Sequence, residues 1–206
     1  VTAAALGAVV LVDANPTGSP LLRKLPLAPA IWIYVPLLVL MARRQPIERY
    51  GLSLANWRGG LTDAAAVLAV LVPTYAIGHM LFRIGIQGHR FVAPFAGDVG
   101  DLLASNLLAI GLPEELFFRG YVLTRLEDAF GPGRKLWGGR LGLAVFASAL
   151  IFNAAHPLAG GSWWQGNMPF GILLGWLWCR RGNLVAPTLV HGITNVVFIL
   201  LERSIR

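Results

Sequence analysis

Two adjacent glutamates in the middle of an apolar stretch are the first residues of this chain that could do chemistry. Glu114 and Glu115 follow Pro113, and Arg119 comes four residues after Glu115. Because an ionised carboxylate is costly inside a bilayer, acids within a membrane span are candidates for function by default. A carboxylate shielded from water can serve as a general base. The segment therefore predicts acid–base chemistry carried by a glutamate.

Helical spacing separates the two glutamates into different roles. Glu115 and Arg119 are four apart, so they share a helix face and can form an ion pair. Glu114 lies about 100° away around the helix and has no such partner. Pro113 suits the first turn of a helix and predicts a broken helix that restarts there, with the positive end of the helix dipole near both carboxylates. The alternative is that all three charged groups form one network that only holds helices together.

Two more segments place polar residues at helical spacing inside apolar runs. Phe152 and His156 are four apart, and so are His191 and Asn195. A single buried histidine is more often a packed core residue than a catalyst. Polar residues of membrane helices face the interior of the bundle. We therefore expect these side chains to converge on Glu114.

Six apolar runs position these groups: residues 25–42, 61–82, 102–126, 141–156, 167–179 and 184–201. About 20 apolar residues are needed to cross the hydrocarbon core of a bilayer. The predicted fold class is all-α, a polytopic membrane bundle of about six to seven transmembrane helices. We expect one integral membrane domain over residues 1–206, with N-terminal helices and loops in 1–100 and a catalytic core in 101–201. The stretches 85–100 and 125–140 are predicted to be loops.

Composition and charge support a membrane location. Only 13% of the residues are charged and 56% are hydrophobic, so too few polar side chains exist to cover a water-facing globule. The formal charge of +7 comes from basic residues between the apolar runs, as expected of anchors at a membrane surface rather than of a nucleic-acid interface. The single cysteine, Cys179, excludes an intrachain disulfide. We expect the lipid bilayer as partner, no nucleic acid, and the bacterial inner (cytoplasmic) membrane as location.

The three motifs together resemble a known family. Glu-Glu-x-x-x-Arg, Phe-x-x-x-His and His-x-x-x-Asn follow one another on separate predicted helices. This order resembles the CPBP family, which comprises CaaX-processing type II prenyl endopeptidases and bacteriocin-processing or immunity proteins. The resemblance covers residues 102–201. It implies a glutamate-type intramembrane endopeptidase with no metal or other cofactor, whose substrate is a membrane-anchored or C-terminally tagged protein or peptide.

The resemblance also implies roles for individual residues. Glu114 and His156 would activate a water molecule for attack on the peptide carbonyl. His191 and Asn195 would hold the oxyanion of the tetrahedral intermediate. Three supporting residues complete the motifs: Glu115, Arg119 and Phe152.

Two other functions remain open at this point. A non-catalytic immunity or scaffold protein could share the fold, although it would have no need of Glu114. A zinc-dependent membrane protease is also conceivable, because two histidines and a glutamate form a zinc ligand set. However, the chain has no His-Glu-x-x-His motif, and a direct Glu114–His156 pair would leave no such set. A transporter is disfavoured, because no inverted repeat is visible.

Overall fold

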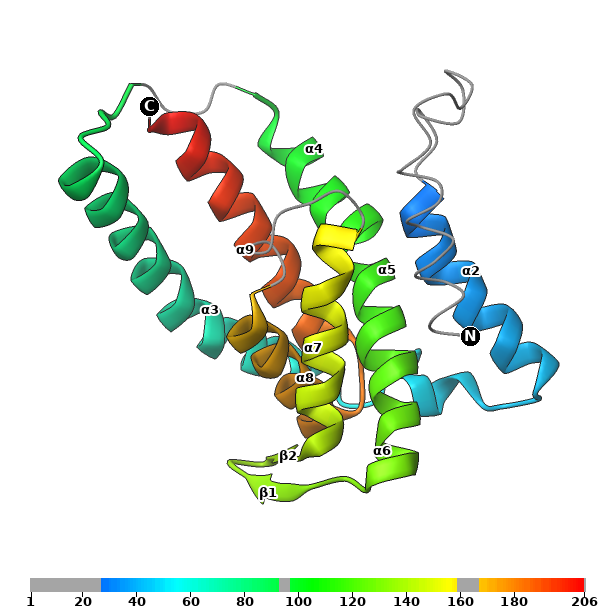
Figure 1. Cartoon of the computed structure of the whole chain (residues 1–206). Coiled ribbons are helices and arrows are strands. Elements are labelled where there is room, and N and C mark those ends of the chain that lie inside the picture. Colours follow the sequence, from blue (N-terminus) through cyan, green and yellow to red (C-terminus); the bar gives the residue numbers. More distant parts are fainter. Residues whose placement is uncertain (1–26, 93–96, 159–166, 206) are drawn as a thin grey trace.

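The computed structural model describes residues 27–92, 97–158 and 167–205 (Figure 1). The α-helices are α2 (Leu27–Ala42), α3 (Trp57–Met80), α4 (Val99–Ala104), α5 (Leu112–Glu115), α6 (Thr124–Phe130), α7 (Leu143–Leu158), α8 (Met168–Arg181) and α9 (Val185–Ser204). Tighter and wider helical segments are the 3-10 helix η2 (Ile47–Tyr50) and the π-helical η3 (Leu81–Ile86), η4 (Ser105–Gly111) and η5 (Leu116–Leu123). The two strands are β1 (Arg134–Leu136) and β2 (Gly139–Leu141). Each of the six predicted apolar runs thus corresponds to a helix; residues 25 and 26 lie outside the described part.

One long helix forms the centre of the molecule. Segments α4, η4, α5, η5 and α6 follow one another without interruption from Val99 to Phe130. The predicted break at Pro113 is wrong, since Leu112 before it has helical angles of φ −60° and ψ −47°. Proline removes one backbone donor and crowds the preceding turn. The π-helical segment η4, which precedes Pro113, widens the turn that the proline ring would crowd.

Aromatic packing fixes α2 and α7 against this central helix. The Trp32 and Phe117 ring centroids are 4.5 Å apart, and those of Phe118 and Phe152 are 5.1 Å apart. All four side chains are buried. Such ring pairs each add about 0.5–1.5 kcal/mol beyond the area they bury. The helix that carries the glutamates is therefore held firmly on two sides.

The distribution of polarity is that of a membrane protein. Large apolar side chains are exposed on the outside, including Val70 at 68% and Leu108 at 65%. Inside, Glu115 is 0% exposed, Arg119 1% and His191 3%. A soluble monomer would not leave so much apolar surface in water while burying its charges. Lipid is the solvent that such a surface requires.

Among the residues that the structure describes, two helices are long and apolar enough to cross a membrane by length and composition. They are the continuous α3–η3 helix, Trp57–Ile86, and α9, Val185–Ser204. Shorter apolar helices span Pro29–Ala42 and Leu143–Pro157. The predicted all-α membrane-type fold is confirmed, whereas the count of six to seven crossings stays a prediction.

The predicted loop 125–140 is wrong in part. Helix α6 continues to Phe130, and a short hairpin follows in which β1 pairs antiparallel with β2. Trp137 and Gly138 form its two-residue turn, with φ of 47° and 79°. Positive φ at both positions matches the right-handed twist of the strands. The sequence pattern is hard to recognise because Trp-Gly replaces the usual Asn-Gly or Asp-Gly.

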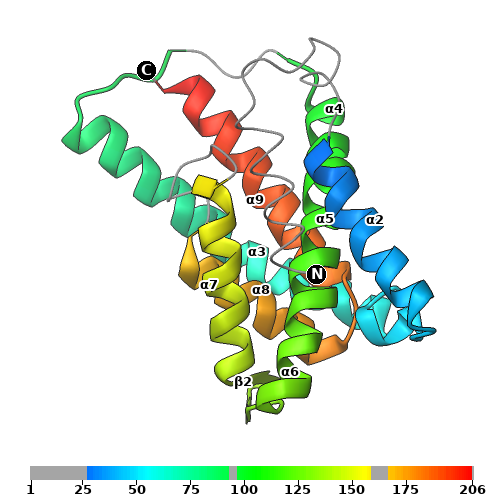
Figure 2. The same cartoon turned by 45° about the vertical axis from the view of Figure 1, so that its right-hand side comes forward.

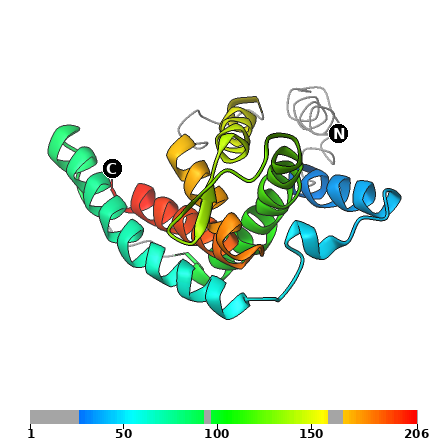
Figure 3. The same cartoon turned by 90° about the horizontal axis from the view of Figure 1, so that it is seen from below.

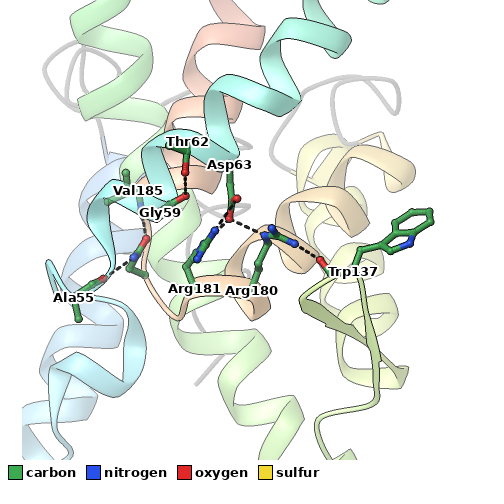
Figure 4. A network of polar contacts seen from close by, with 9 residues as sticks. Ala55, Gly59, Thr62, Asp63, Trp137, Arg180, Arg181 and Val185 are labelled. Carbon is green, nitrogen blue, oxygen red and sulfur yellow. Dashed lines mark hydrogen bonds and ion pairs between the residues drawn. The ribbon is translucent and has the colours of Figure 1, made fainter.

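A charged cluster ties three distant parts of the chain together at the hairpin end (Figure 4). Asp63 of α3 accepts hydrogen bonds from Arg180 Nε at 2.8 Å and from Arg181 Nε and Nη2 at 2.6 and 2.9 Å. Arg180 also donates to the backbone carbonyl of Trp137 in the hairpin turn. The position of such basic pairs between apolar runs predicts anchors at the membrane surface. The structure shows that these two arginines fasten α3 to the end of α8.

We expect Asp63→Asn to destabilise the fold without involving the catalytic motifs. Removing the charge weakens hydrogen bonds from two partly exposed arginines, at a cost of about 1–2 kcal/mol. For a chain of this size that corresponds to a fall of about 2–8 °C in Tm, measured in detergent by the fluorescence of buried tryptophans. Glu48→Gln, at an exposed acid in η2, is the matched control. Equal Tm values for the two variants would contradict a fastening role for Asp63.

Candidate active site

The predicted site residues come from three helices that meet in the interior. Glu114 and Glu115 lie on α5, Phe152 and His156 on α7, and His191 and Asn195 on α9. Figure 2 shows α9 passing close to the α4–α5 part of the central helix, and the two elements are in contact. Glu115 and His191 are fully or almost fully buried, and Glu114, His156 and Asn195 are half-buried.

Glu115 is the acceptor at the centre of a charged triad. Its Oε1 accepts from Arg119 Nη1 at 2.8 Å, which confirms the pairing expected from their spacing. The same oxygen lies 2.7 Å from His191 Nδ1. Because an ionised carboxylate can only accept, Nδ1 carries a proton in this arrangement. Glu115 therefore fixes the orientation of the His191 ring and presents its Nε2 in the opposite direction.

Glu114 lies on the Nε2 side of that ring. Its Oε2 is 3.7 Å from His191 Nε2, a charge contact that is too long for a hydrogen bond. In the described part of the chain this buried oxygen has no hydrogen-bond partner. His191 is therefore a neighbour of Glu114. Spacing along one helix could not predict this contact, because His191 comes from α9. A buried carboxylate oxygen without a donor is available to bind a water molecule or a substrate proton.

Two glycines allow α9 to come close enough for these contacts. A Cβ on Gly192 would lie 2.6 Å from Leu107 Cδ2 and 3.0 Å from the Asn106 carbonyl oxygen. A Cβ on Gly111 would lie 2.9 Å from that same oxygen and 3.3 Å from the carbonyl oxygen of Thr188. Any larger residue would push the two helices apart. His191 reaches both glutamates because neither position carries a side chain.

The Phe152 ring packs against the charged triad. The Arg119 guanidinium carbon lies 4.2 Å from the centroid of the Phe152 ring, within reach of a cation–π contact. The ring also meets His156 edge-on at 4.7 Å and His191 edge-on at 5.8 Å between centroids. Phe152 therefore contacts three of the predicted site residues at once. It also shields Arg119 from lipid and water.

His156 and Asn195 stand apart from the triad. The Nδ1 atom of His156 lies 3.0 Å from the backbone oxygen of Phe152, one turn earlier in α7. Within the described residues, neither His156 nor Asn195 makes a hydrogen bond or ion pair with Glu114. The structure thus brings together Glu114, Glu115, Arg119, Phe152 and His191, and places His156 against the same aromatic ring.

Helix α8 contributes two groups that the sequence did not reveal. The carbonyl oxygen of Gly171 accepts from Arg119 Nη2 at 3.4 Å. Phe170 meets His191 edge-on with 5.9 Å between ring centroids. A backbone acceptor cannot be recognised from the pattern of side chains, and Phe170 is one of many aromatic residues in the apolar runs. The packing of α8 against the central helix produces the first contact, and its packing against α9 produces the second.

Within residues 27–92, 97–158 and 167–205, no group of three or more His, Cys, Asp or Glu side chains is arranged to hold a metal ion. His191 faces two carboxylates, while His156 is directed at its own helix. These side chains form a carboxylate–histidine site rather than a recognisable zinc ligand set.

The fold and the site define an α-helical membrane-type protein with a buried glutamate–arginine–histidine cluster. Residues 101–197 match the family model Rce1-like, described as type II CAAX prenyl endopeptidase Rce1-like. The resemblance to the CPBP family expected from the three motifs is thereby confirmed over this part of the chain. No curated protein and no solved structure matches the chain. The family model describes endopeptidases of the CAAX-processing type.

Proposed function

We propose that this chain is a glutamate-type intramembrane endopeptidase that hydrolyses a membrane-anchored or C-terminally tagged protein or peptide precursor. One observation carries the proposal: Glu114 holds a buried oxygen without a hydrogen-bond partner, next to a histidine that a second glutamate orients. An unpaired buried acceptor is costly, so a water molecule or a substrate donor that binds this oxygen would lower its free energy. The catalytic core would comprise residues 101–201, within one membrane domain of the bacterial inner membrane.

In the proposed reaction Glu114 is the general base. It takes a proton from a water molecule, assisted by His156, and the water oxygen attacks the carbonyl carbon of the scissile peptide bond. A positioned base of this kind contributes about 10²–10⁴-fold to the rate. Glu114 then returns the proton to the leaving nitrogen, and the carbon–nitrogen bond breaks. No covalent bond to the enzyme is formed at any step.

His191 and Asn195 are the proposed donors to the oxyanion. They are four apart on α9, so both side chains lie on the same helix face. Because Nδ1 of His191 is occupied by Glu115, Nε2 is the ring atom that can face the substrate. It donates to an oxyanion only when the ring carries its second proton. Glu115, Arg119 and Phe152 hold this ring in place and are positioning residues.

We expect cleavage to be independent of metal. Purified protein in proteoliposomes, incubated with a membrane-anchored peptide, should keep its activity after exhaustive treatment with a chelator, and it should contain no stoichiometric zinc. A known zinc peptidase in the same buffer serves as the control and should lose activity. Loss of cleavage with the chelator and recovery with zinc would instead assign Glu114, His156 and His191 as metal ligands.

A further inference from the structure

The β1–β2 hairpin exposes a tryptophan in a strained backbone conformation. Trp137 in its turn is 81% exposed, more than any other large apolar side chain of the described residues. Its φ of 47° lies in the left-handed region, which a bulky side chain rarely adopts. Asparagine or glycine at this position would form the same turn with less strain. A strained residue that is held in place points to a function for its side chain.

Helix α8 holds the hairpin in a fixed position. Trp176 donates its indole N–H to the Leu136 carbonyl oxygen at 2.8 Å, and Arg180 donates to the carbonyl oxygen of Trp137. Gly139 allows the close approach, because a Cβ there would lie 2.5 Å from Trp176 Nε1. The backbone of the turn is thus bonded to α8, while the Trp137 ring points away from the bundle (Figure 4).

Two exposed cations lie in the strand before the turn. Arg134 and Lys135 of β1 are exposed, and neither forms an ion pair within the residues that the structure describes. Arg140 of β2, in contrast, pairs with Glu127 at 3.0 Å. The segment 131–142 contains no acidic residue. The exposed surface of the hairpin is therefore cationic and complements an anionic partner.

The hairpin lies at one end of the bundle, beside the end of α6, where the apolar helices give way to charged residues (Figure 1). The central helix has no charged residue between the buried Arg119 and Arg125, and α8 ends on a pair of arginines. Such a boundary is typical of the surface of a bilayer. Phe130 and Leu143, which flank the hairpin in the chain, are exposed apolar residues, so the lipid-facing surface continues up to it.

An exposed tryptophan beside two exposed cations fits the headgroup region of a bilayer. Tryptophan is enriched at membrane interfaces, because its ring is apolar and its N–H can form a hydrogen bond. Lysine and arginine at that depth attract anionic lipids, and each raises their local concentration by up to about fivefold. A stable protein–protein interface buries about 800 Å² on each partner, which a single short hairpin does not provide.

We propose that the β1–β2 hairpin is a binding site for the headgroups of anionic phospholipids. The Trp137 ring lies at the boundary between headgroups and acyl chains, and Arg134 and Lys135 bind the lipid phosphates. None of these three residues takes part in the proposed hydrolysis. Because the hairpin is bonded to α8, the bound lipids also fix the depth of that helix in the bilayer.

Quenching of Trp137 fluorescence by spin-labelled lipids tests this proposal. The protein is reconstituted into phosphatidylcholine vesicles that contain a fixed fraction of lipid with a nitroxide near the headgroup, as either phosphatidylglycerol or phosphatidylcholine. The difference in emission between the wild type and Trp137→Phe isolates the signal of Trp137. We expect the phosphatidylglycerol nitroxide to quench this signal at least about twofold more strongly. Equal quenching by the two lipids, quenching by aqueous acrylamide alone, or no quenching by any of them would overturn the proposal.

Charge variants identify the residues that select the lipid. The double variant Arg134→Gln with Lys135→Gln should remove the preference for phosphatidylglycerol, because phosphatidylcholine differs from it in net charge. The exchange of Arg134→Lys with Lys135→Arg keeps both charges and should retain the preference. A preference that survives the loss of both charges would contradict the assignment of these cations.

Trp137→Asn separates lipid binding from a structural role. Asparagine adopts the left-handed conformation of this turn more readily than tryptophan, so Tm in detergent should be unchanged or higher. In native mass spectra recorded with added phosphatidylglycerol, the lipid-bound fraction should fall at least about fivefold, since the apolar ring is no longer buried among lipids. An unchanged lipid-bound fraction would contradict the role of Trp137.

Discussion

Glu114→Gln is expected to lower the rate of cleavage of a membrane-anchored substrate by about 10²–10⁴-fold and to leave the protein folded. Glutamine keeps the size of the side chain but cannot take a proton from water. Stability should change little, because the approach of Glu114 Oε2 to His191 Nε2, at 3.7 Å, is too long for a hydrogen bond. Release of the soluble fragment in proteoliposomes measures the rate, and Tm in detergent measures folding.

His156→Ala and His191→Ala belong to the same test and should each abolish cleavage. They should differ in stability, because His191 bonds the buried Glu115, whereas the contacts of His156 with the described residues are to its own helix and to an aromatic ring. Glu48→Gln, at an exposed acid far along the chain from the motifs, is the control for the charge change. A fully active Glu114→Gln enzyme would refute the role of Glu114 as base.

Glu115→Gln should damage the fold as well as the activity. It leaves Arg119, which is 1% exposed, as a buried cation without a carboxylate in hydrogen-bond contact. Removing one partner of a buried ion pair costs about 3–5 kcal/mol. Tm in detergent is expected to fall by roughly 6–20 °C, on the scaling of about 2–4 °C per kcal/mol for chains of this size. Glu127→Gln, which breaks a more exposed pair with Arg140, should have a smaller effect.

A double variant separates the structural role from the chemical one. Combining Glu115→Gln with Arg119→Leu removes the stranded charge and should recover much of the lost Tm, because apolar replacement of a buried ion pair is often neutral or stabilising. Cleavage should remain impaired, since His191 then has no carboxylate to fix its ring. A double variant as unstable as Glu115→Gln alone would contradict the ion-pair explanation.

The spacing of residues along the chain was sufficient to predict some features of the structure and insufficient to predict others. The Glu115–Arg119 pair follows from four residues on one helix, and the apolar runs followed the helices closely. The continuous helix through Pro113 could not be predicted, because π-helical turns depend on the packing around them. The approach of His191 to both glutamates depends on Gly111 and Gly192 letting two distant helices touch.

Charge pairs between residues far apart in the sequence could not be predicted either. Asp63 was visible as an acid within a span, and Arg180 and Arg181 as a basic pair after one. Nothing in their spacing connects them, since more than a hundred residues separate the two groups. Figure 3 shows how α3 lies along the side of the bundle, where its first turns meet the end of α8. That arrangement is a tertiary property and does not appear in the local pattern.

The most direct test of the proposed hydrolysis is to follow it with purified components. Wild-type protein in phosphatidylcholine vesicles, with an anchored peptide as substrate and ¹⁸O-labelled water as solvent, should release one fragment with a new C-terminus that contains a single solvent oxygen. Glu114→Gln, prepared in the same way and equally folded, should release none above background. Equal release by both proteins, or no release by a folded wild-type protein from any of a series of anchored peptides, would contradict a Glu114-dependent intramembrane peptidase.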